Sequence, residues 1–526
     1  MSIRIQTTEN LCCDCVSKYK VFFLLLIDYI TEQMDRKITG SDLYKDIYNS
    51  QPIQVLISVD KQITRNLTIG QIATRPSGSN GVWCCVLLPT VLVFYSIVHQ
   101  VSELYTFLAY TSVGLLSYCF LFTLFLSLTN LILDEHVFEG CAAATLVATL
   151  FIYASQGYGL VFSLIYPAIA VYSFSLLLRV VLLKCPQTFT LGEAMLVVQS
   201  IVLFCLMFFC MFFYGMGEEA DYETQLINAV IFTILSSVGI IVTVLCVLDE
   251  RHKTLATLGT IASVAGTYAL LSLHLLLGID CLIQIASYIF LDSRKLRLCM
   301  LWLGLVILAV VPVLGRTRLN IKADTVTRKI FHILASIVFL TGIVFDIQLI
   351  TLATGVGFSL MILVEALRKS KIEKISPALQ AAFEVYSDEK DVGCFAMTPL
   401  YLFVGLACPL ILVPIHPGYE VELLSGVLSI GIGDTAASWF GSKYGNNKWA
   451  DGQKSVEGTA FNILSQVGAM YALQFFDIMT TPNALFRVAV SAAISGLVEA
   501  KTDQVDNLVL PLVSIIAFQL TTIFSY

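Results

Sequence analysis

The sequence has few charged residues for its length. Only 13% of its 526 residues are Asp, Glu, Lys or Arg, whereas such residues usually make up about a quarter of a soluble protein. Hydrophobic residues reach 57%, and they gather in repeated runs of about 20 residues, the length that spans a bilayer. The scarcity of charge excludes an ordinary soluble domain, and the runs predict an all-α, polytopic integral membrane protein.

Two further absences narrow the function. The net charge is −7, and because nucleic-acid binding depends on a positive surface, a nucleic-acid partner is excluded on electrostatic grounds. The 15 cysteines are scattered, mostly inside apolar runs, where cysteine acts as a small hydrophobic residue. The segment "LCCDCV" is followed by no second Cys/His pair at zinc-finger spacing, so a structural zinc site is not expected.

The apolar runs divide the chain into three regions. Residues 1–80 are expected to be mostly extramembrane or interfacial, 81–315 to form a multi-helix membrane region, and 316–526 to form a second membrane domain that carries the polar motifs. We expect roughly 15 transmembrane helices. The predicted spans are 82–99, 104–128, 139–155, 158–183, 195–214, 226–248, 254–277, 279–292 (which is short), 298–314, 329–345, 347–366, 396–415, 421–440, 459–478, 484–499 and 508–524.

The connectors of the third region differ in charge. Following the chain back and forth puts 315–328, 367–395, 441–458 and 500–507 on one side of the membrane. With Lys329 at a span edge, these connectors carry 14 Lys or Arg residues, whereas the tight turns on the other side carry none. Because basic loops stay in the cytosol, all the polar motifs are predicted to meet at one cytosolic face.

The densest motif is "GDTAASWFGSKYGNNKWADGQKSVEGT", residues 433–459. It begins with Asp434 inside an otherwise apolar helix, where an acid costs about 2.5–3.5 kcal/mol at mid-membrane and is a candidate functional residue. A buried structural acid is the alternative. Ala437, Gly441 and Gly445 follow at intervals of four and line one helical face. That face indicates either close helix packing or close approach of a ligand to the backbone.

Lysines and acids alternate in the rest of the motif. Lys443, Lys448 and Lys454 suit phosphate groups, and the interleaved Asp451 and Glu457 favour a Mg²⁺–triphosphate over a simple patch for anionic lipid heads, which is the alternative. The segment "GNNKWADGQKS" is not a P-loop, because six residues separate its glycines and no strand precedes it. A nucleotide site here must have a different architecture.

This motif resembles the signature of the CTP-dependent lipid kinases, with dolichol kinases as the best match and the likeness strongest from about residue 325 to 526. Gln453 stands where the family has a lysine, and Ser455 replaces a threonine but keeps the hydroxyl. The resemblance implies a CTP-binding loop. Its residues would be Gly441, Ser442, Lys443, Tyr444, Gly445, Asn446, Asn447, Lys448, Trp449, Gly452, Gln453, Lys454, Ser455, Glu457, Gly458 and Thr459.

Three further groups lie on the same predicted face and resemble motifs of that family. The first is Arg328, Lys329 and His332, for which interface anchoring with a packed histidine is the alternative. The second is the acidic Asp388, Glu389 and Asp391, which a solvated loop would also explain. The Glu365–Arg368 pair precedes it in the sequence, and a local ion pair explains the spacing of that pair equally well. The third group, which could instead be an interhelical polar cap, comprises Glu499, Asp503, Asp506 and Asn507. Together with Arg328, Lys329, Glu365 and Arg368, these four residues are predicted to support the phosphates and the site.

The resemblance implies transfer of the γ-phosphate of CTP to dolichol or a related polyisoprenoid, which yields dolichyl phosphate for protein glycosylation, at the cytosolic face of the endoplasmic reticulum membrane. Asp434 and Glu457 would hold Mg²⁺, or another divalent cation such as Ca²⁺, and Lys454 would stabilise the γ-phosphate. The base would be His332, Asp388 or Asp391. Three alternatives stay open: a kinase for another lipid alcohol (polyprenol, phytol or diacylglycerol), cytidylyl transfer to phosphatidate, and, because carriers also have intramembrane acids, a transporter.

Overall fold

The computed structural model describes residues 51–128, 139–214, 221–319, 321–387, 391, 393–449 and 454–523. Within these ranges the chain is helical and contains no β-strand, only one isolated bridge between Lys448 and Ser455, so the all-α prediction is confirmed. Most of the predicted N-terminal segment lies outside the described residues. The same holds for Asp388, Glu389, Asp451, Gly452 and Gln453.

The first part of the chain consists mainly of long apolar helices. These are α3 (Gln51–Ile69), η1 (Val82–Val86), α4 (Leu87–Val98), α5 (Glu103–Leu128), α6 (Glu139–Gln156), α7 (Leu160–Lys184), α8 (Leu191–Tyr214), α9 (Tyr222–Val247), η2 (Glu250–His252), α10 (Leu255–Leu277), α11 (Cys281–Phe290) and α12 (Ser293–Leu319).

The second part alternates long helices with short ones. These are α13 (Thr325–Phe345), α14 (Ile347–Lys369), α15 (Ile375–Tyr386), α16 (Met397–Leu412), α17 (Tyr419–Leu423), η3 (Val427–Asp434), α18 (Thr435–Tyr444), α19 (Val456–Phe475), α20 (Ala484–Lys501) and α21 (Asp506–Ile523).

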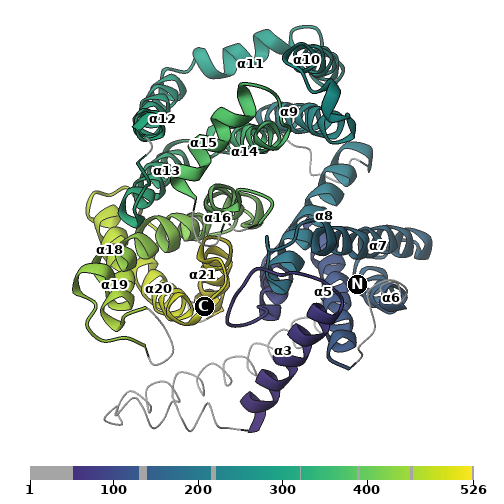
Figure 1. Ribbon diagram of the computed structural model, residues 1–526, viewed down its shortest axis with the longest axis vertical. Coiled ribbons are helices and arrows are strands. Elements are labelled where there is room, and N and C mark those ends of the chain that lie inside the picture. Colours follow the sequence, from purple (N-terminus) through teal and green to yellow (C-terminus); the bar gives the residue numbers. More distant parts are fainter. Residues whose placement is uncertain are drawn as a thin grey trace, which may run out of the picture.

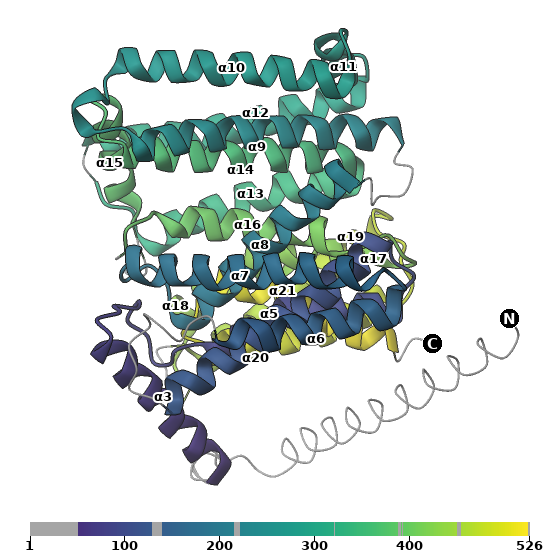
Figure 2. The same cartoon turned by 90° about the vertical axis from the view of Figure 1, so that its right-hand side faces the viewer.

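The lengths and compositions of these helices fit a multi-pass membrane protein. Among the described residues, eight helices are long and apolar enough to cross a bilayer, and five shorter apolar helices accompany them. Figure 2 shows the long helices running roughly along one direction, as membrane spans do. The exact number of crossings stays a prediction. The short 279–292 run forms only the ten-residue helix α11.

One predicted span is not a single α-helix. The 421–440 run contains the short helix α17, the π-helix η3 and the helix α18 in succession. A π-helix is wider than an α-helix, occurs mostly in short pieces, and is frequent at functional sites. Gly426, Gly431 and Gly433 lie in or beside η3, and a Cβ on each would collide with a neighbouring helix. The glycines therefore let this irregular segment pass through the middle of the helix bundle, which the apolar pattern alone did not reveal.

The C-terminal helices form a compact group around η3. In Figure 1, α18, α19, α20 and α21 lie together beside α13 and α16, and η3 makes contacts with all six. The helices α9 to α12 lie further out on the same side as α13 and α14, while α5 to α8 form a separate cluster. The irregular segment is therefore at the centre of the second membrane region.

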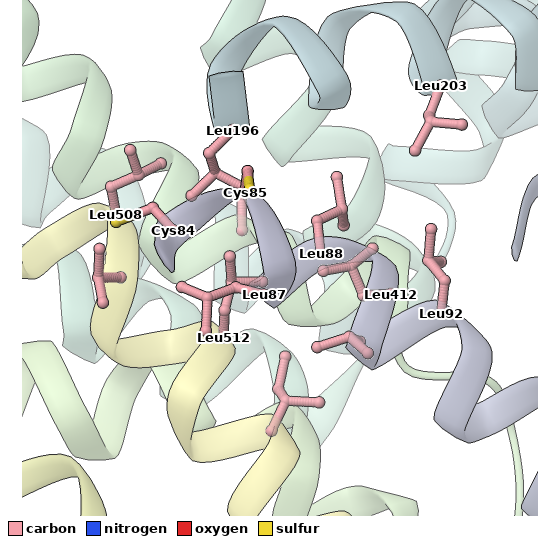
Figure 3. Close-up of a cluster of buried hydrophobic side chains, with 14 of the residues drawn as sticks. Cys84, Cys85, Leu87, Leu88, Leu92, Leu196, Leu203, Leu412, Leu508 and Leu512 are labelled. Carbon is pink, nitrogen blue, oxygen red and sulfur yellow. The ribbon is translucent and has the colours of Figure 1, made fainter. Parts of the chain in front are cut away.

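The two halves of the chain share one hydrophobic core. Figure 3 shows Cys84, Cys85 and Leu88 of the first half packed among residues of α8 and α21. Both cysteine side chains are fully buried, as expected of cysteine acting as a small hydrophobic residue. Leu508 and Leu512 of α21 lie on the other side of this contact. Packing of α4 against α21 therefore fixes the first half to the helix group that surrounds η3.

Candidate functional site

A polar cavity of about 510 Å³ opens beside the end of η3. Helices α13, α16, α18, α19, α20 and α21, together with the loops before α19 and α21, supply its walls. Fifteen of the residues that the sequence singled out line it: Arg328, Lys329, His332, Asp434, Ala437, Gly441, Ser442, Lys448, Lys454, Ser455, Gly458, Thr459, Glu499, Asp506 and Asn507. Motifs separated by more than 170 positions in the sequence thus meet around one space.

Asp434 ends the π-helix and faces this cavity. Its residue is 5% exposed, and its carboxylate accepts a short hydrogen bond from the Lys329 ammonium of α13. A buried acid needs such a partner, because burying an isolated charge is very costly. The α13 helix begins where the Asp324 side chain accepts a hydrogen bond from the Thr327 amide, which places Lys329 in the first turns at the level of Asp434.

Lys454 lies between two further acids of the cavity. Its ammonium is 2.8 Å from Glu499 Oε1 and 3.4 Å from Asp506 Oδ1, and it donates to the Glu499 carbonyl at 2.5 Å. Burial lowers the pKa of Lys454, but the carboxylates of Asp506 and Glu499 outweigh it and raise that pKa above its usual value. Lys454 therefore stays positively charged throughout the physiological pH range.

Asp434, Glu499 and Asp506 form a group that fits a divalent cation. One oxygen from each carboxylate lies within 4.8 Å of the others. Carboxylate oxygens are the ligands that Mg²⁺ and Ca²⁺ prefer, and Mg²⁺ is usually held by one or two carboxylates together with phosphate oxygens. Lys329 and Lys454 supply positive charge to the same acids here. The acids thus fit the predicted cation, with Asp434 as the member that the sequence assigned to it.

Glu457, the second predicted metal ligand, has a different position. It lies outside the cavity lining, and its carboxylate accepts hydrogen bonds from the Asn447 backbone amide at 3.1 Å and from the Asn447 side chain at 2.7 Å. This pairing closes the loop between α18 and α19. Glu499 and Asp506, which the sequence assigned to site support, stand next to Asp434 instead.

The loop itself is held in a hairpin-like shape. Trp449 N donates to Lys454 O at 3.0 Å, and Val456 N donates to Asn447 O at 2.9 Å. The Trp449 indole donates to Thr459 Oγ1 at 3.1 Å, and the Lys501 ammonium lies 5.1 Å from the centre of its ring. Both ends of the loop are thereby fixed to α19 and α20, so that Lys448 and Lys454 reach the cavity.

The small residues of the motif serve close packing and also border the cavity. A Cβ at Gly441 would lie 3.3 Å from the Gly458 Cα, and one at Gly445 would lie 2.4 Å from Ser455 Oγ. Helices α18 and α19 therefore approach each other through bare backbone, as the packing interpretation predicted. Because Gly441 and Gly458 also line the cavity, the same contact leaves backbone accessible to a ligand.

His332 has a buried ring nitrogen available for chemistry. The residue is 7% exposed and lines the cavity. Its Nδ1 atom has no hydrogen-bond partner among the described residues. Buried polar atoms are nearly always paired, so an unpaired one at a cavity wall indicates a place where a ligand atom binds.

Several predicted residues lie behind the cavity. Asp391 accepts a hydrogen bond from the Thr398 amide at 3.0 Å, and Glu365 accepts one from the Ala396 amide at 3.0 Å while pairing with Arg368 at 2.6 Å. These residues therefore fix the start of α16, which brings Thr398 to the cavity wall. Of the four connectors expected to enclose the site, 367–395 contributes none of its described residues to the lining. The other predicted residues outside the lining are Lys443, Tyr444, Gly445, Asn446, Asn447, Trp449 and Asp503.

Thr398, Ser438 and Val505 line the cavity without having been predicted. Ser438 comes four residues after Asp434, so helical spacing could have indicated it. Thr398 and Val505 carry no such signal, because their places depend on long-range contacts. Val505 N donates to Glu193 Oε1 at 2.9 Å, and Glu193 is paired with Arg75 at 2.5 Å in the other half of the chain. The first half thus anchors the 502–506 loop, a role that its apolar sequence did not reveal.

Comparison with known proteins supports the resemblance that the motifs indicated. Over 257 residues, 46% of this chain and 48% of the mouse protein, the chain is 30% identical to a mouse dolichol kinase. It is 28% identical to "Dolichol kinase EVAN" of Arabidopsis thaliana over 44% of the chain and 41% of that protein, and 24% identical to a dolichol kinase of Saccharomyces cerevisiae over 48% and 47%. The matches thus span about half the length of these relatives. No protein-family model and no solved structure matches the chain.

Proposed function

We propose that this chain, whose curated relatives are dolichol kinases, transfers the γ-phosphate of CTP to the hydroxyl group of dolichol or a closely related polyisoprenoid. The observation that carries the proposal is the cavity in which Asp434, Lys454, Glu499 and Asp506 meet beside the loop that resembles a CTP-binding signature. We also propose that the enzyme resides in the endoplasmic reticulum membrane with this cavity facing the cytosol, as the basic connectors predict.

Four basic residues of the cavity would bind the triphosphate: Arg328, Lys329, Lys448 and Lys454. Phosphoryl transfer requires positioning and neutralisation of charge more than covalent help from the protein. Lys329 and Lys454 are paired with Asp434, Glu499 and Asp506. In a complex with the nucleotide, these ammonium groups would exchange carboxylate for phosphate oxygens, and the ion pairs hold the lysines in position for that exchange.

Asp434, Glu499 and Asp506 would hold a divalent cation, with Mg²⁺ as the first candidate. When bound, such an ion neutralises charge that develops on the phosphate oxygens. Glu457 would act on the loop rather than on the ion, since its carboxylate binds Asn447. Lys329 and Lys454 lie beside these acids and supply compensating positive charge.

Of the predicted bases that the structure describes, His332 is the better placed to accept the proton of the alcohol. Its Nδ1 has no partner among the described residues at the cavity wall, whereas Asp391 is engaged with the Thr398 amide behind it. A general base must come within hydrogen-bond distance of the proton that it removes. His332 is on α13 one turn beyond Lys329, so an alcohol near the bound phosphates would lie near both side chains.

A phosphate-transfer assay with the purified full-length chain in lipid vesicles tests this proposal. We expect label from γ-labelled CTP to appear on dolichol, with ATP a poor donor. Lys454→Ala should lower the rate at least about 100-fold, because it removes a charge that stabilises the transition state. Lys371→Ala is the matched control, since Lys371 is an exposed lysine that pairs with Glu250 away from the cavity.

The position of the label separates the alternatives. A kinase leaves the γ-label on the lipid, whereas a cytidylyltransferase acting on phosphatidate releases it as pyrophosphate and leaves an α-label on the lipid. Uptake of a solute without CTP turnover, unchanged in Lys454→Ala, would favour a transporter. Either of these results would overturn the proposed kinase activity.

A further inference from the structure

A second, apolar cavity of about 390 Å³ lies next to the polar one. Residues from α13, η3, α18 and α19 line it. Its wall is almost wholly hydrocarbon, and the polar side chains in it are Ser336, Thr435 and Ser465. The Ser465 hydroxyl donates to the Asn462 carbonyl of its own helix at 3.0 Å, and the Thr435 hydroxyl donates to the Ile430 carbonyl of η3 at 3.4 Å. The cavity therefore suits an apolar ligand.

The two cavities are lined by consecutive turns of the same helices. On α13, His332 faces the polar cavity, and Ser336 and Leu340 face the apolar one. These positions are four residues apart, so they form one stripe that runs about 12 Å along the helix. On the opposite wall, Asp434 lines the polar cavity, whereas Gly431 and Val427, three and seven residues earlier, line the apolar one. The stripes meet at the level of His332 and Asp434.

The helix α18 divides the cavities further along. Ala437, Ser438 and Gly441 border the polar cavity, and Ala436, Trp439 and Phe440 border the apolar one. Successive residues are about 100° apart around a helix, so these two sets occupy opposite faces. One end of α18, next to Asp434, is thus the place where a molecule could extend from one cavity to the other.

The apolar cavity opens toward the side of the helix bundle. Trp439 is 48% exposed, Ile333 is 40% exposed and Ile337 is 37% exposed, although all three are hydrophobic residues of helices in the membrane region. Exposed apolar side chains on a membrane-spanning helix face lipid, because water is absent there. A ligand of the apolar cavity would therefore enter from the bilayer.

We propose that this apolar cavity, bordered by Ile333, Ile337, Leu340, Val427, Gly431 and Trp439, holds the hydrocarbon tail of the lipid alcohol substrate while its hydroxyl reaches the polar cavity beside His332 and Asp434. The inference rests on the proposed kinase function and specifies how its acceptor binds. Ser336 Oγ is buried without a partner among the described residues and lies one helical turn after His332 on α13. It could therefore form a hydrogen bond with the alcohol group of the lipid. All residues that line this groove belong to the second half of the chain.

Photolabelling in vesicles tests the inference without using catalysis. The probe is a long polyisoprenyl alcohol with a diazirine in the units next to the hydroxyl, added with no nucleotide. We expect labelled peptides from α13 and α18, competed by unlabelled dolichol and not by phosphatidylcholine. Labelling confined to α4–α12 would overturn the inference, as would equal competition by the phospholipid, which would identify the cavity as a place for ordinary membrane lipid.

A substitution that fills the groove provides the kinetic test. Ile337→Trp places a larger side chain in the cavity wall, and we expect it to lower kcat/KM for dolichol about tenfold, the effect of a misfit in an apolar pocket. The KM for CTP and the rate with a short, water-soluble terpene alcohol should stay within about twofold of wild type. Ile330→Trp is the matched control, because Ile330 is on the same helix, 47% exposed, and outside both cavity linings.

The outcomes distinguish the two proposals. If the wild-type protein transfers no phosphate from CTP to any polyisoprenoid alcohol, the proposed function fails. If the wild type is active and Ile337→Trp uses dolichol as well as wild type does, the groove assignment fails and the kinase proposal stands. An equal loss of kcat/KM with long and short alcohols would also overturn the groove assignment. A groove that binds the hydrocarbon tail must affect a long alcohol more than a short one.

Discussion

Helices α20 and α21 carry a polar cluster at each of their ends, and the two clusters differ in how their groups are satisfied. At one end, Glu499 and Asp506 belong to the open cavity. At the other end, about 18 Å along α20, Arg487 belongs to what we call the closed cluster, with Glu422, His416, Tyr95 and Gln519. Both clusters contain a buried acid, a basic residue and a histidine.

The closed cluster has its central groups paired. Glu422 is fully buried, and its two oxygens accept from the Arg487 guanidinium, from the Tyr95 hydroxyl and, at 2.7 Å, from the Gln519 amide. His416 Nε2 lies 3.0 Å from the same carboxylate. Arg487 donates to the Gly418 carbonyl at 3.0 Å as well. A satisfied buried network of this kind rigidifies the structure and leaves no group for a substrate.

The open cavity has the opposite properties. The His332 Nδ1 atom has no partner within the described part of the chain, three acids converge within 4.8 Å, and the space beside them measures about 510 Å³. Access and incomplete pairing therefore distinguish the cluster to which we assign the proposed activity from the closed cluster, to which we assign a structural role. Since Tyr95 comes from α4, the closed cluster also ties the two halves of the chain together.

The largest effect should come from Asp434→Asn, which keeps the shape of the side chain and removes its charge. We expect the rate of phosphate transfer to fall about 1000-fold, because the carboxylate would neither hold the cation nor orient Lys329. Initial rates with γ-labelled CTP measure it, and the melting temperature of the purified protein is the control. A variant with more than a tenth of wild-type activity would show that Asp434 is a structural acid, like Glu422.

Glu422→Gln should lower the stability of the protein and leave its activity per folded molecule nearly unchanged. The substitution leaves Arg487 buried without its counter-charge, so the free energy of unfolding should fall by about 3–5 kcal/mol. Thermal unfolding in detergent measures the loss, and activity per folded molecule should stay within about twofold of wild type. Glu420→Gln is the matched control, since Glu420 is only half-buried and accepts one long hydrogen bond of 3.5 Å from Thr481. Loss of activity without loss of stability would break the distinction between the two clusters.

Glu193→Gln should show an intermediate effect, because Glu193 is in the first half yet anchors the loop before Asp506. Its carboxylate accepts from the Val505 amide at 2.9 Å and pairs with Arg75. We expect kcat to fall about tenfold, because small displacements of catalytic groups are costly. A rise in the Mg²⁺ concentration needed for half-maximal rate should accompany the fall. If that concentration does not change, the anchor does not act on the acidic group.

The smallest effect should come from Ser455, which caps α19 by accepting from the Gly458 amide at 3.1 Å and also lines the cavity. Ser455→Ala should cost about 1 kcal/mol of stability through loss of the cap. Ser455→Thr keeps the hydroxyl and should behave like wild type. Unfolding curves and the KM for CTP of both variants measure these effects. Equal behaviour of Ala and Thr would show that the hydroxyl contributes nothing.

Much of the site could be predicted because its residues lie in motifs that are unusual for their surroundings. Asp434, Lys454 and Glu499 stand out as charges in or beside apolar helices, and the alternation of connectors predicted that they share one side. Their exact neighbours could not be predicted. Glu457 is a carboxylate three residues after Lys454, which is why the sequence predicted it as a metal ligand. Its side chain binds Asn447 instead, because the hairpin-like loop turns it away from the cavity.

The sequence by itself determined the apolar helical architecture and the set of polar motifs, because hydrophobic run length and isolated charges are local properties that need no partner to be recognised. Only the tertiary structure decided which acids stand together, that a π-helix carries Asp434, that Glu193 of the first half anchors the Val505 loop, and that an apolar cavity adjoins the polar one. The physical reason is that these features arise from contacts between helices far apart in the chain, and such contacts leave no periodic signal in any one of them.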